Sequence, residues 1–190
     1  MGSSAHSERP SLAEAVTADE LLRLDTSNKR TELVRGQLVV REPAGYRHGD
    51  VAARILGALF AYVNSRTLGR VFTAETGFLL RRKPDTVRAA DVSFVKQDRL
   101  PHPAPRGFAE LAPDLVVEVL SPDDRPGEVL SKVGDWLEAG ARLVWVIDPE
   151  RRDARVYRAD GSQVHLGESD QLDGESVVPG FQCAVRGLVS

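Results

Sequence analysis

One carboxylate stands in a stretch of sequence that otherwise reads as a buried β-strand. The stretch is Pro113-Asp-Leu-Val-Val-Glu-Val-Leu-Ser-Pro122, and its acid Glu118 lies near the end of the Val- and Leu-rich run. A buried charge costs several kcal/mol unless it is paired or binds a metal ion. The carboxyl end of a strand that leads into a helix is also where α/β folds place ligands. Glu118 is therefore the first candidate for a catalytic or metal-binding residue.

A second acid, Asp91, opens another apolar stretch, Asp91-Val-Ser-Phe-Val95. If the two strands are neighbours, about 4.8 Å apart, both carboxylates can reach one divalent cation. Carboxylate oxygens, with waters completing an octahedron, suit Mg²⁺ or Mn²⁺. Asp114 is a poorer partner for Glu118, because four residues along one strand separate the two acids by roughly 13 Å.

Lys132 is the third candidate, on the helix expected after the Glu118 strand. It lies between Val129 and Trp136 of the apolar stripe and so borders the buried face of that helix. An ammonium group there could reach Glu118, orient a metal-bound water and offset charge on a phosphorane-like transition state. The alternative is a surface lysine whose stem covers apolar atoms while its charge stays in water.

Other kinds of chemistry find little support in the sequence. The glycine-rich phosphate loops GxGxxG and GxxxxGK[ST] are missing, and so is a GxSxG nucleophile elbow. The histidines His6, His48, His102 and His165 have no zinc-ligand spacing. The single cysteine, Cys183, cannot form an intramolecular disulfide, and we interpret it as a small core residue.

Length and composition indicate one globular domain. Of the 190 residues, 42% are hydrophobic, enough for a sizeable core. We expect residues 1–16 to be a disordered or tag-like segment and residues 17–190 to form the domain. Neither a signal peptide nor an apolar run long enough to span a membrane is visible, so we expect a cytoplasmic protein without membrane contact.

Charge is distributed unevenly along the chain. The formal net charge is −3, which argues weakly against broad affinity for nucleic acid. Residues 66–106 contain nine basic and four acidic residues, a local charge of +5. This basic segment could form a phosphate-binding face, or its charges could simply be solvated. Its basic residues are Arg66, Arg70, Arg81, Arg82, Lys83, Arg88, Lys96, Arg99 and Arg106.

The order of expected elements is mixed α/β with a β-rich ending. A strand, a helix and a second strand over residues 114–147 form a βαβ unit, which predicts a parallel pair. Three helices are expected. A short one begins at the capping box Thr17-Ala-Asp-Glu20, and two longer ones cover Val51–Ser65 and Pro126–Ala139. A Pro/Gly loop is expected over 43–48 and a proline-rich one over 97–113. The expected strands are Thr31–Val34, Leu38–Arg41, Arg70–Leu80 with a break near Gly77, Ala89–Val95, Asp114–Leu120, Arg142–Ile147, Ala154–Arg158, Val164–Leu166, Ser176–Val178 and Gln182–Val185.

Six ordered landmarks together resemble one known family. They are Thr31-Glu-Leu-Val-Arg-Gly36, Asp91-Val-Ser-Phe-Val95, the Glu118 stretch, Lys132 with Trp136-Leu-Glu-Ala-Gly140, Val144-Trp-Val-Ile-Asp-Pro149, and Val178-Pro-Gly-Phe181. With this set, running from about residue 17 to 189, the chain resembles the Uma2 family of restriction-endonuclease-like proteins.

The resemblance implies the PD-(D/E)xK nuclease fold, an α/β restriction-endonuclease-like core. Its central mixed β-sheet would be flanked by helices, with extra N- and C-terminal strands. It implies Asp91 and Glu118 as metal ligands, Lys132 as the catalytic lysine moved onto a helix, and Glu32 as an accessory acid. A hairpin ion pair to Arg35 or Arg41 is the alternative for Glu32.

The chain departs from the superfamily pattern at two positions. Ala90 stands before Asp91, where most relatives have proline, a residue that shapes the strand entry and carries no chemistry. Leu120 stands two residues after Glu118, so the literal ExK sequence is missing. Activity therefore depends on Lys132 reaching the site from its helix.

The sequence thus predicts a Mg²⁺- or Mn²⁺-dependent endonuclease that hydrolyses DNA phosphodiesters. The Val119 carbonyl is a further expected metal ligand, and His48 could contact phosphate or cap its helix. Cleavage of both strands needs two sites, so a homodimer is expected on duplex DNA. Two alternatives stay open: a catalytically inactive nucleic-acid-binding or scaffold protein on the same fold, and an enzyme acting on RNA or on nucleotide-like small molecules.

Overall fold

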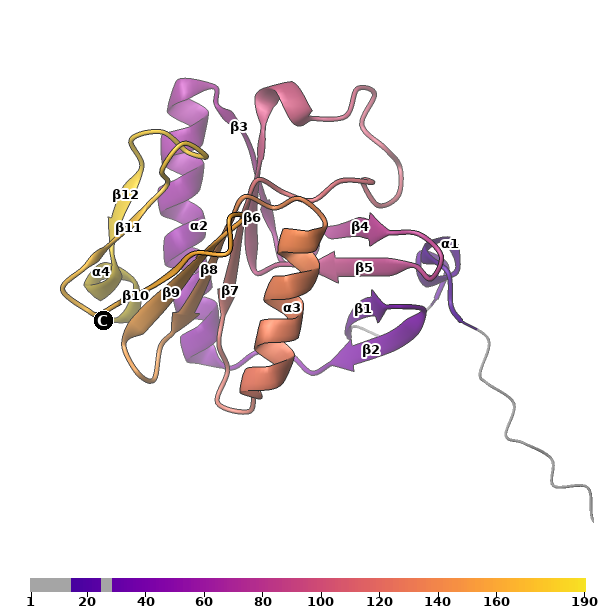
Figure 1. Ribbon diagram of the computed structural model, residues 1–190, viewed down its shortest axis with the longest axis horizontal. Coiled ribbons are helices and arrows are strands. Elements are labelled where there is room, and N and C mark those ends of the chain that lie inside the picture. The colour runs from indigo at the N-terminus through magenta and orange to yellow at the C-terminus, as the bar shows by residue number, and fades with distance from the viewer. Residues whose placement is uncertain (1–14, 25–28) are drawn as a thin grey trace, which may run out of the picture.

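The structure is a computed structural model that describes residues 15–24 and 29–190 (Figure 1). The elements in chain order are α1 (Ala18–Leu21), β1 (Arg30–Val34), β2 (Gln37–Arg41), α2 (Tyr46–Arg66), β3 (Gly69–Thr73), β4 (Gly77–Arg81), β5 (Thr86–Ala89), β6 (Val92–Lys96), the 3₁₀ helix η1 (Gln97–Arg99), β7 (Leu115–Val119), α3 (Pro126–Glu138), β8 (Leu143–Asp148), β9 (Asp153–Arg158), β10 (Gln163–Leu166), β11 (Gln171–Asp173), β12 (Gln182–Ala184) and α4 (Val185–Val189).

The larger sheet has six strands in the order β10-β9-β8-β7-β6-β3. Strands β7 and β8 are parallel, and the other neighbouring strands are antiparallel. The predicted βαβ unit is therefore present as β7, α3 and β8, with its parallel pair. The α/β class and the central mixed sheet predicted from the sequence are confirmed.

Two helices cover opposite faces of this sheet (Figure 1). On one face α2 buries Val51, Ile55 and Leu59 in the main core. On the other face α3 buries Val133 and Trp136 in a second core. The sheet is thus buried on both sides, which explains why its central strands read as continuous Val- and Leu-rich runs.

The alternation of β7 decides which core receives each of its side chains. Val117 and Val119 point into the core beneath α2, and Val116 points into the core beneath α3. Glu118, two residues after Val116, shares the face of α3. Its carboxylate is therefore directed towards the helix that carries Lys132.

The smaller sheet, of four strands in the order β2-β1-β5-β4, lies beside the larger one. Its own small core contains Leu21 of α1, Leu33 of β1 and Val87 of β5. The chain crosses from the small sheet to the large one between β5 and β6, at Ala90 and Asp91. The single strand predicted over Ala89–Val95 was wrong in this respect, since periodicity does not show a change of sheet.

Two further predictions were wrong at element boundaries. Helix α2 begins at Tyr46, so the loop predicted over 43–48 ends earlier; the apolar periodicity that reveals the helix only starts at Val51. Ser176–Val178 forms turns, where the amides of Val177 and Val178 both donate to the Gly174 carbonyl at 3.0 and 2.8 Å. The apolar valines there fill the core without joining a sheet.

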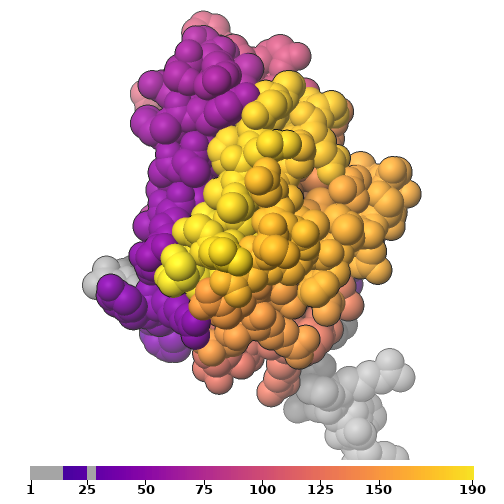
Figure 2. Space-filling view, turned by 90° about the vertical axis from the view of Figure 1, so that its left-hand side faces the viewer, coloured from indigo at the N-terminus to yellow at the C-terminus, as the bar shows by residue number. Residues whose placement is uncertain are grey.

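The C-terminal strands and α4 pack beside α2 (Figure 2). The Arg54 guanidinium of α2 donates to the Gly187 carbonyl of α4 at 3.2 Å. The predicted disordered or tag-like segment over residues 1–16 falls largely on residues 1–14, outside the described residues. Within the described part of the chain, no helix has the length and apolar character needed to cross a membrane.

Candidate active site

A cleft with a volume of about 760 Å³ opens where the small sheet, the start of α2 and α3 meet the carboxyl end of β7. Glu32 of β1, His48 of α2, Asp91, Glu118 and Lys132 all line it. The structure therefore brings together the residues singled out in the sequence. The acids lining the cleft are Glu32, Glu42, Glu75, Asp91, Glu118, Asp123, Asp124 and Glu128, and the lysines and arginines are Lys29, Arg30, Arg41 and Lys132.

Asp91 lies at the passage between the two sheets, where its carboxylate reaches three donors. Oδ2 accepts the backbone N–H of Val119 at 2.8 Å and lies 3.1 Å from Nε2 of His48. Oδ1 accepts from the Arg30 guanidinium at 3.1 Å. Burial would raise the pKa of Asp91, but the hydrogen bond and charge of His48, with the charge of Lys132, lower it to about 2. Asp91 is therefore a carboxylate at neutral pH.

Glu118 lies on the neighbouring strand, since β6 pairs with β7 through Val92 and Val117. Its Oε2 accepts from Nζ of Lys132 at 2.8 Å, and its Oε1 accepts from Nε1 of Trp136 at 2.8 Å. Burial raises the pKa of Glu118 to about 7, opposed by the Lys132 charge and assisted by the charges of Asp91 and Glu32. Burial therefore favours the protonated form of Glu118 even with the Lys132 ammonium beside it.

Lys132 projects from α3 into the middle of the acids. Besides Glu118, its Nζ contacts the Ala89 carbonyl at 3.1 Å and Oε1 of Glu32 at 3.3 Å. Its side chain is 14% exposed. A lysine held by three acceptors and largely removed from water is not the surface lysine of the alternative interpretation.

Glu32 belongs to an ion-pair network that sequence reasoning missed. Its Oε2 accepts from the Arg88 guanidinium at 2.9 Å and its Oε1 from the Ala89 amide at 3.0 Å. Arg88 also donates its Nε to Asp135 of α3 at 3.0 Å. Burial would raise the pKa of Glu32, but Lys132 and Arg88 hold it below its ordinary value. The partner of Glu32 is thus Arg88 rather than Arg35.

Val119 and His48 both contact Asp91. The amide of Val119 donates to Oδ2 of Asp91, and the Val119 carbonyl stays a predicted metal ligand. His48 lies within the first turn of α2 rather than at its entry. Its Nε2 faces Asp91, and its buried Nδ1 has no hydrogen-bond partner among the described residues.

The nine lysines and arginines of residues 66–106 do not line the cleft. Arg88 is buried in the network above, and Arg81, Arg82 and Arg99 pair with Glu138, Glu110 and Asp114, respectively. The lining of the cleft thus gives no support to the suggestion that this segment forms a phosphate-binding face, which stays a prediction. Much of its positive charge serves ion pairs within the fold.

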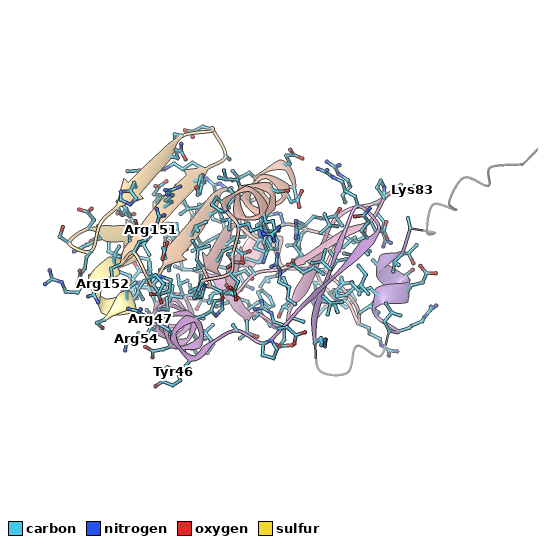
Figure 3. The ribbon with its side chains drawn as sticks, turned by 90° about the horizontal axis from the view of Figure 1, so that it is seen from below. Tyr46, Arg47, Arg54, Lys83, Arg151 and Arg152 are labelled. Atoms are coloured by element: carbon cyan, nitrogen blue, oxygen red, sulfur yellow. The ribbon has the colours of Figure 1, made fainter. Side chains whose placement is uncertain are left out.

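Arginines near the start of α2 are paired as well (Figure 3). Arg47 contacts Glu150, in the turn after β8, at 2.9 Å, and Arg54 contacts Asp50 at 2.9 Å. Tyr46, the first residue of α2, is 94% exposed. The charges of Arg47 and Arg54 are thus partly met by acids of the chain itself.

The donor set of the cleft suits a hard divalent cation. The described residues hold no cluster of three or more His, Cys, Asp or Glu side chains arranged to bind a metal. Asp91 and Glu118 could hold a cation with waters as further ligands, since each carboxylate oxygen can accept more than one bond. The surplus of acids over lysines and arginines in the lining favours the binding of a cation there.

The fold resembles a known crystal structure, described as that of a putative nuclease belonging to DUF820 from Anabaena variabilis. The TM-score is 0.81 and the sequence identity 20%, over 92% of this chain and 97% of that one. No curated protein matches the chain. The Uma2 family model, described as a putative restriction endonuclease, matches residues 18–186. Because this match covers nearly all of the domain, the protein belongs to the Uma2 family of putative restriction endonucleases.

Proposed function

We propose that this protein is a Mg²⁺- or Mn²⁺-dependent endonuclease that hydrolyses phosphodiester bonds of DNA. The observation that carries the proposal is the convergence of Asp91, Glu118 and Lys132 in one cleft. Two carboxylates on adjacent strands and one ammonium, 2.8 Å from Glu118, match the needs of metal-assisted phosphoryl transfer. Family membership supports the nuclease class.

The charge of the cleft supports a requirement for a cation. Its eight acids outnumber its four lysines and arginines. A phosphate anion entering such a cleft meets net repulsion unless additional positive charge is present. When bound between Asp91 and Glu118, a divalent cation would polarise the phosphodiester and lower the pKa of a coordinated water.

Three groups of contacts would position the side chains of this site for metal binding and hydrolysis. His48 and the Val119 amide hold the Asp91 carboxylate in one orientation. Trp136 does the same for Glu118. The Lys132 ammonium, fixed by its three acceptors, can donate to an attacking water or to a phosphate oxygen that gains charge in the transition state.

We further propose a cytoplasmic protein that acts on duplex DNA as a homodimer. Each chain has one such cleft, and cleavage of both strands of a duplex calls for two. No separate recognition domain is present among the described residues, so binding would rest on phosphate contacts rather than on base reading.

The test is cleavage of supercoiled plasmid by the wild type and by Asp91→Ala. Nicking is expected with Mn²⁺ or Mg²⁺, is expected to cease with EDTA and is expected to vanish in the variant. Asp98→Ala, which removes an exposed acid of η1, is the matched control and should cut like the wild type. Absence of cleavage with either metal, or equal cleavage by Asp91→Ala, would contradict the proposal. Cleavage rates on single-stranded DNA and on RNA, measured in the same way, would show which nucleic acid the protein prefers.

One observation favours a second candidate, a non-catalytic scaffold or nucleic-acid-binding protein. Both oxygens of Asp91 and both of Glu118 already have protein donors, as in a structural ion-pair network. That candidate predicts that Mn²⁺ leaves the thermal stability unchanged. The nuclease proposal predicts a rise in Tm with Mn²⁺ that Asp91→Ala abolishes.

A further inference from the structure

Strand β2 forms one border of the small sheet, and its outer edge has no strand partner among the described residues (Figure 1). The opposite border, β4, is covered by a loop. There the amide of Leu79 donates to the Ala109 carbonyl at 2.9 Å, and Phe78 forms a bridge with Ala109. A loop thus closes the β4 edge, whereas the described residues leave the β2 edge available for pairing.

The turn between β1 and β2 fixes which backbone groups face outwards. Arg35 and Gly36 both have positive φ, 50° and 80°, as a two-residue type I′ turn requires. The flanking pair Val34 and Gln37 is then hydrogen-bonded, and hydrogen-bonded pairs recur at every second residue. Val39 therefore bonds back to β1, because it lies two residues after Gln37.

Leu38 and Val40 point their backbone N–H and C=O groups away from β1. Their side chains are 40% and 48% exposed. They share a sheet face with their cross-strand partners Leu33 and Thr31, and Leu33 is fully buried in the small core. The apolar surface of this core thus continues outwards to the edge of β2.

The central residues of β2, Leu38 to Val40, carry none of the side chains that usually protect a free edge. Natural edge strands carry lysine, proline, bulges or inward-pointing charges that discourage pairing with another chain. Strand β2 reads Gln-Leu-Val-Val-Arg and pairs with β1 in unbroken register. An apolar strand of this kind is suited to accept another strand.

We propose that two copies of this chain associate by antiparallel pairing of their β2 strands around Val39. In this register Leu38 of each copy lies opposite Val40 of the other, and both pairs exchange backbone hydrogen bonds. Apolar side chains then meet apolar side chains, and Gln37 meets Arg41. Centring the pair on Val40 would set Leu38 against the charged Glu42, so the apolar pattern selects one register.

The association would join the two small sheets into one continuous sheet and extend the cleft. Val40 and Arg41 line the cleft of their own chain, so the partner strand would continue the wall next to them. The dimer itself does not depend on any chemistry at the site. Its use, presenting two clefts to one duplex, rests on the proposed nuclease function.

A disulfide experiment tests the register directly. Val39 would face its own copy in a non-hydrogen-bonded pair with Cα atoms about 4.5 Å apart, within disulfide range. Val39→Cys, in a Cys183→Ser background, should therefore form a covalent dimer on mild oxidation. Leu38→Cys is the matched control, because the two Leu38 Cα atoms would be roughly 8 Å apart, too far to bridge. Equal cross-linking of both variants, or of neither, would overturn the proposal.

A proline experiment tests the edge without breaking the hairpin. Val40→Pro removes an outward N–H that β1 does not use, and with it half of the inter-copy hydrogen bonds. Gln163→Pro is the matched control on the edge strand β10. Because the Arg158 amide donates to the Ser162 carbonyl at 3.0 Å, the N–H of Gln163 also points outwards.

Analytical ultracentrifugation should find the wild type and Gln163→Pro as dimers and Val40→Pro as a monomer, with similar circular dichroism for all three. A monomeric wild type, a dimer that survives Val40→Pro, or a dimer broken by Gln163→Pro instead would overturn the proposal. The cross-linking pair decides the matter if Val40→Pro fails to fold. Sedimentation needs neither metal nor DNA, so this result is independent of the plasmid assay.

Discussion

Replacing Arg88 by methionine should show how far the site depends on a buried cation remote from the proposed chemistry. The Arg88 side chain is 6% exposed and pairs with Glu32 and Asp135, whose side chains are 6% and 11% exposed. Methionine retains much of the volume but no charge or donor. Two carboxylates would then be left buried without their main partner.

The expected loss of stability is about 3–5 kcal/mol, the usual result of removing one member of a buried ion pair. For a chain of this size, each kcal/mol lowers Tm by about 2–4 °C. The Tm of Arg88→Met should therefore fall by roughly 6–20 °C. Arg152→Met is the matched control: its pair with Glu168 is at the surface, where the Arg152 side chain is 40% exposed, and a much smaller loss than that of Arg88→Met is expected.

The pH dependence of this loss gives a second check. Burial would raise the pKa of Glu32, but the charges of Lys132 and Arg88 outweigh this effect and lower the pKa below its ordinary value of 4.5. The stabilisation from ionised Glu32 is thus present above pH 4.5 and is lost as pH falls through the lowered value. Without Arg88 the folded pKa of Glu32 rises, so the deficit should be greatest near pH 7 and should shrink as the pH falls below 4.5.

Urea unfolding of the wild type and Arg88→Met at pH 7 and at about pH 4 measures both effects. The triple variant Arg88→Met, Glu32→Gln, Asp135→Asn should recover part of the stability, since neutral amides cost less to bury than unpaired carboxylates. A loss below about 1 kcal/mol for Arg88→Met, typical of a surface pair, would refute the reasoning. So would a loss of equal size at both pH values.

Three more predictions follow from the same contacts. Lys132→Met should reduce metal-dependent nicking by about 10²–10³-fold, because it removes a positioned donor at the reacting phosphate; undiminished nicking would exclude Lys132 from the reaction. Trp136→Phe keeps an aromatic ring but removes the Nε1 donor to Glu118 and part of the buried indole. It should cost at least about 1–3 kcal/mol in urea unfolding, and no loss would argue against that bond. Mn²⁺ at a hundredfold excess over its Kd should stabilise the wild type by about 2.7 kcal/mol, read as a Tm shift, and Asp91→Ala should lose the shift.

The main features of the site could be predicted because they depend on patterns among residues close together in the sequence. Glu118 is conspicuous as a charge in an apolar strand, and the βαβ unit around it follows from strand and helix periodicity. Lys132 borders the apolar stripe of its helix, so the spacing allows an inward direction but does not exclude a surface lysine. The neighbouring position of the Asp91 strand was an assumption that the pairing of β6 with β7 confirms.

The network around Arg88 could not be predicted, because its partners are distant in sequence. Glu32 is 56 residues away and Asp135 is 47 residues away. A composition count places Arg88 among the charges of a basic segment, and only the packing of β5 against β1 and α3 shows that it is buried. The break at Asp91 is hidden for a related reason: an apolar alternation continues through the point where the chain changes sheets.

The position of the lysine follows from what the strand needs for packing. Two residues after Glu118, on the same face, stands Leu120, which packs into the core beneath α3. The ammonium comes instead from α3, where Lys132, Asp135 and Trp136 share one helical face and each contacts a residue of the site network. The packing of α3 against the sheet therefore also sets the positions of the charged groups in the cleft. A core change such as Val133→Ala, which touches neither carboxylate, should impair nicking and stability together, whereas Asp98→Ala should affect neither.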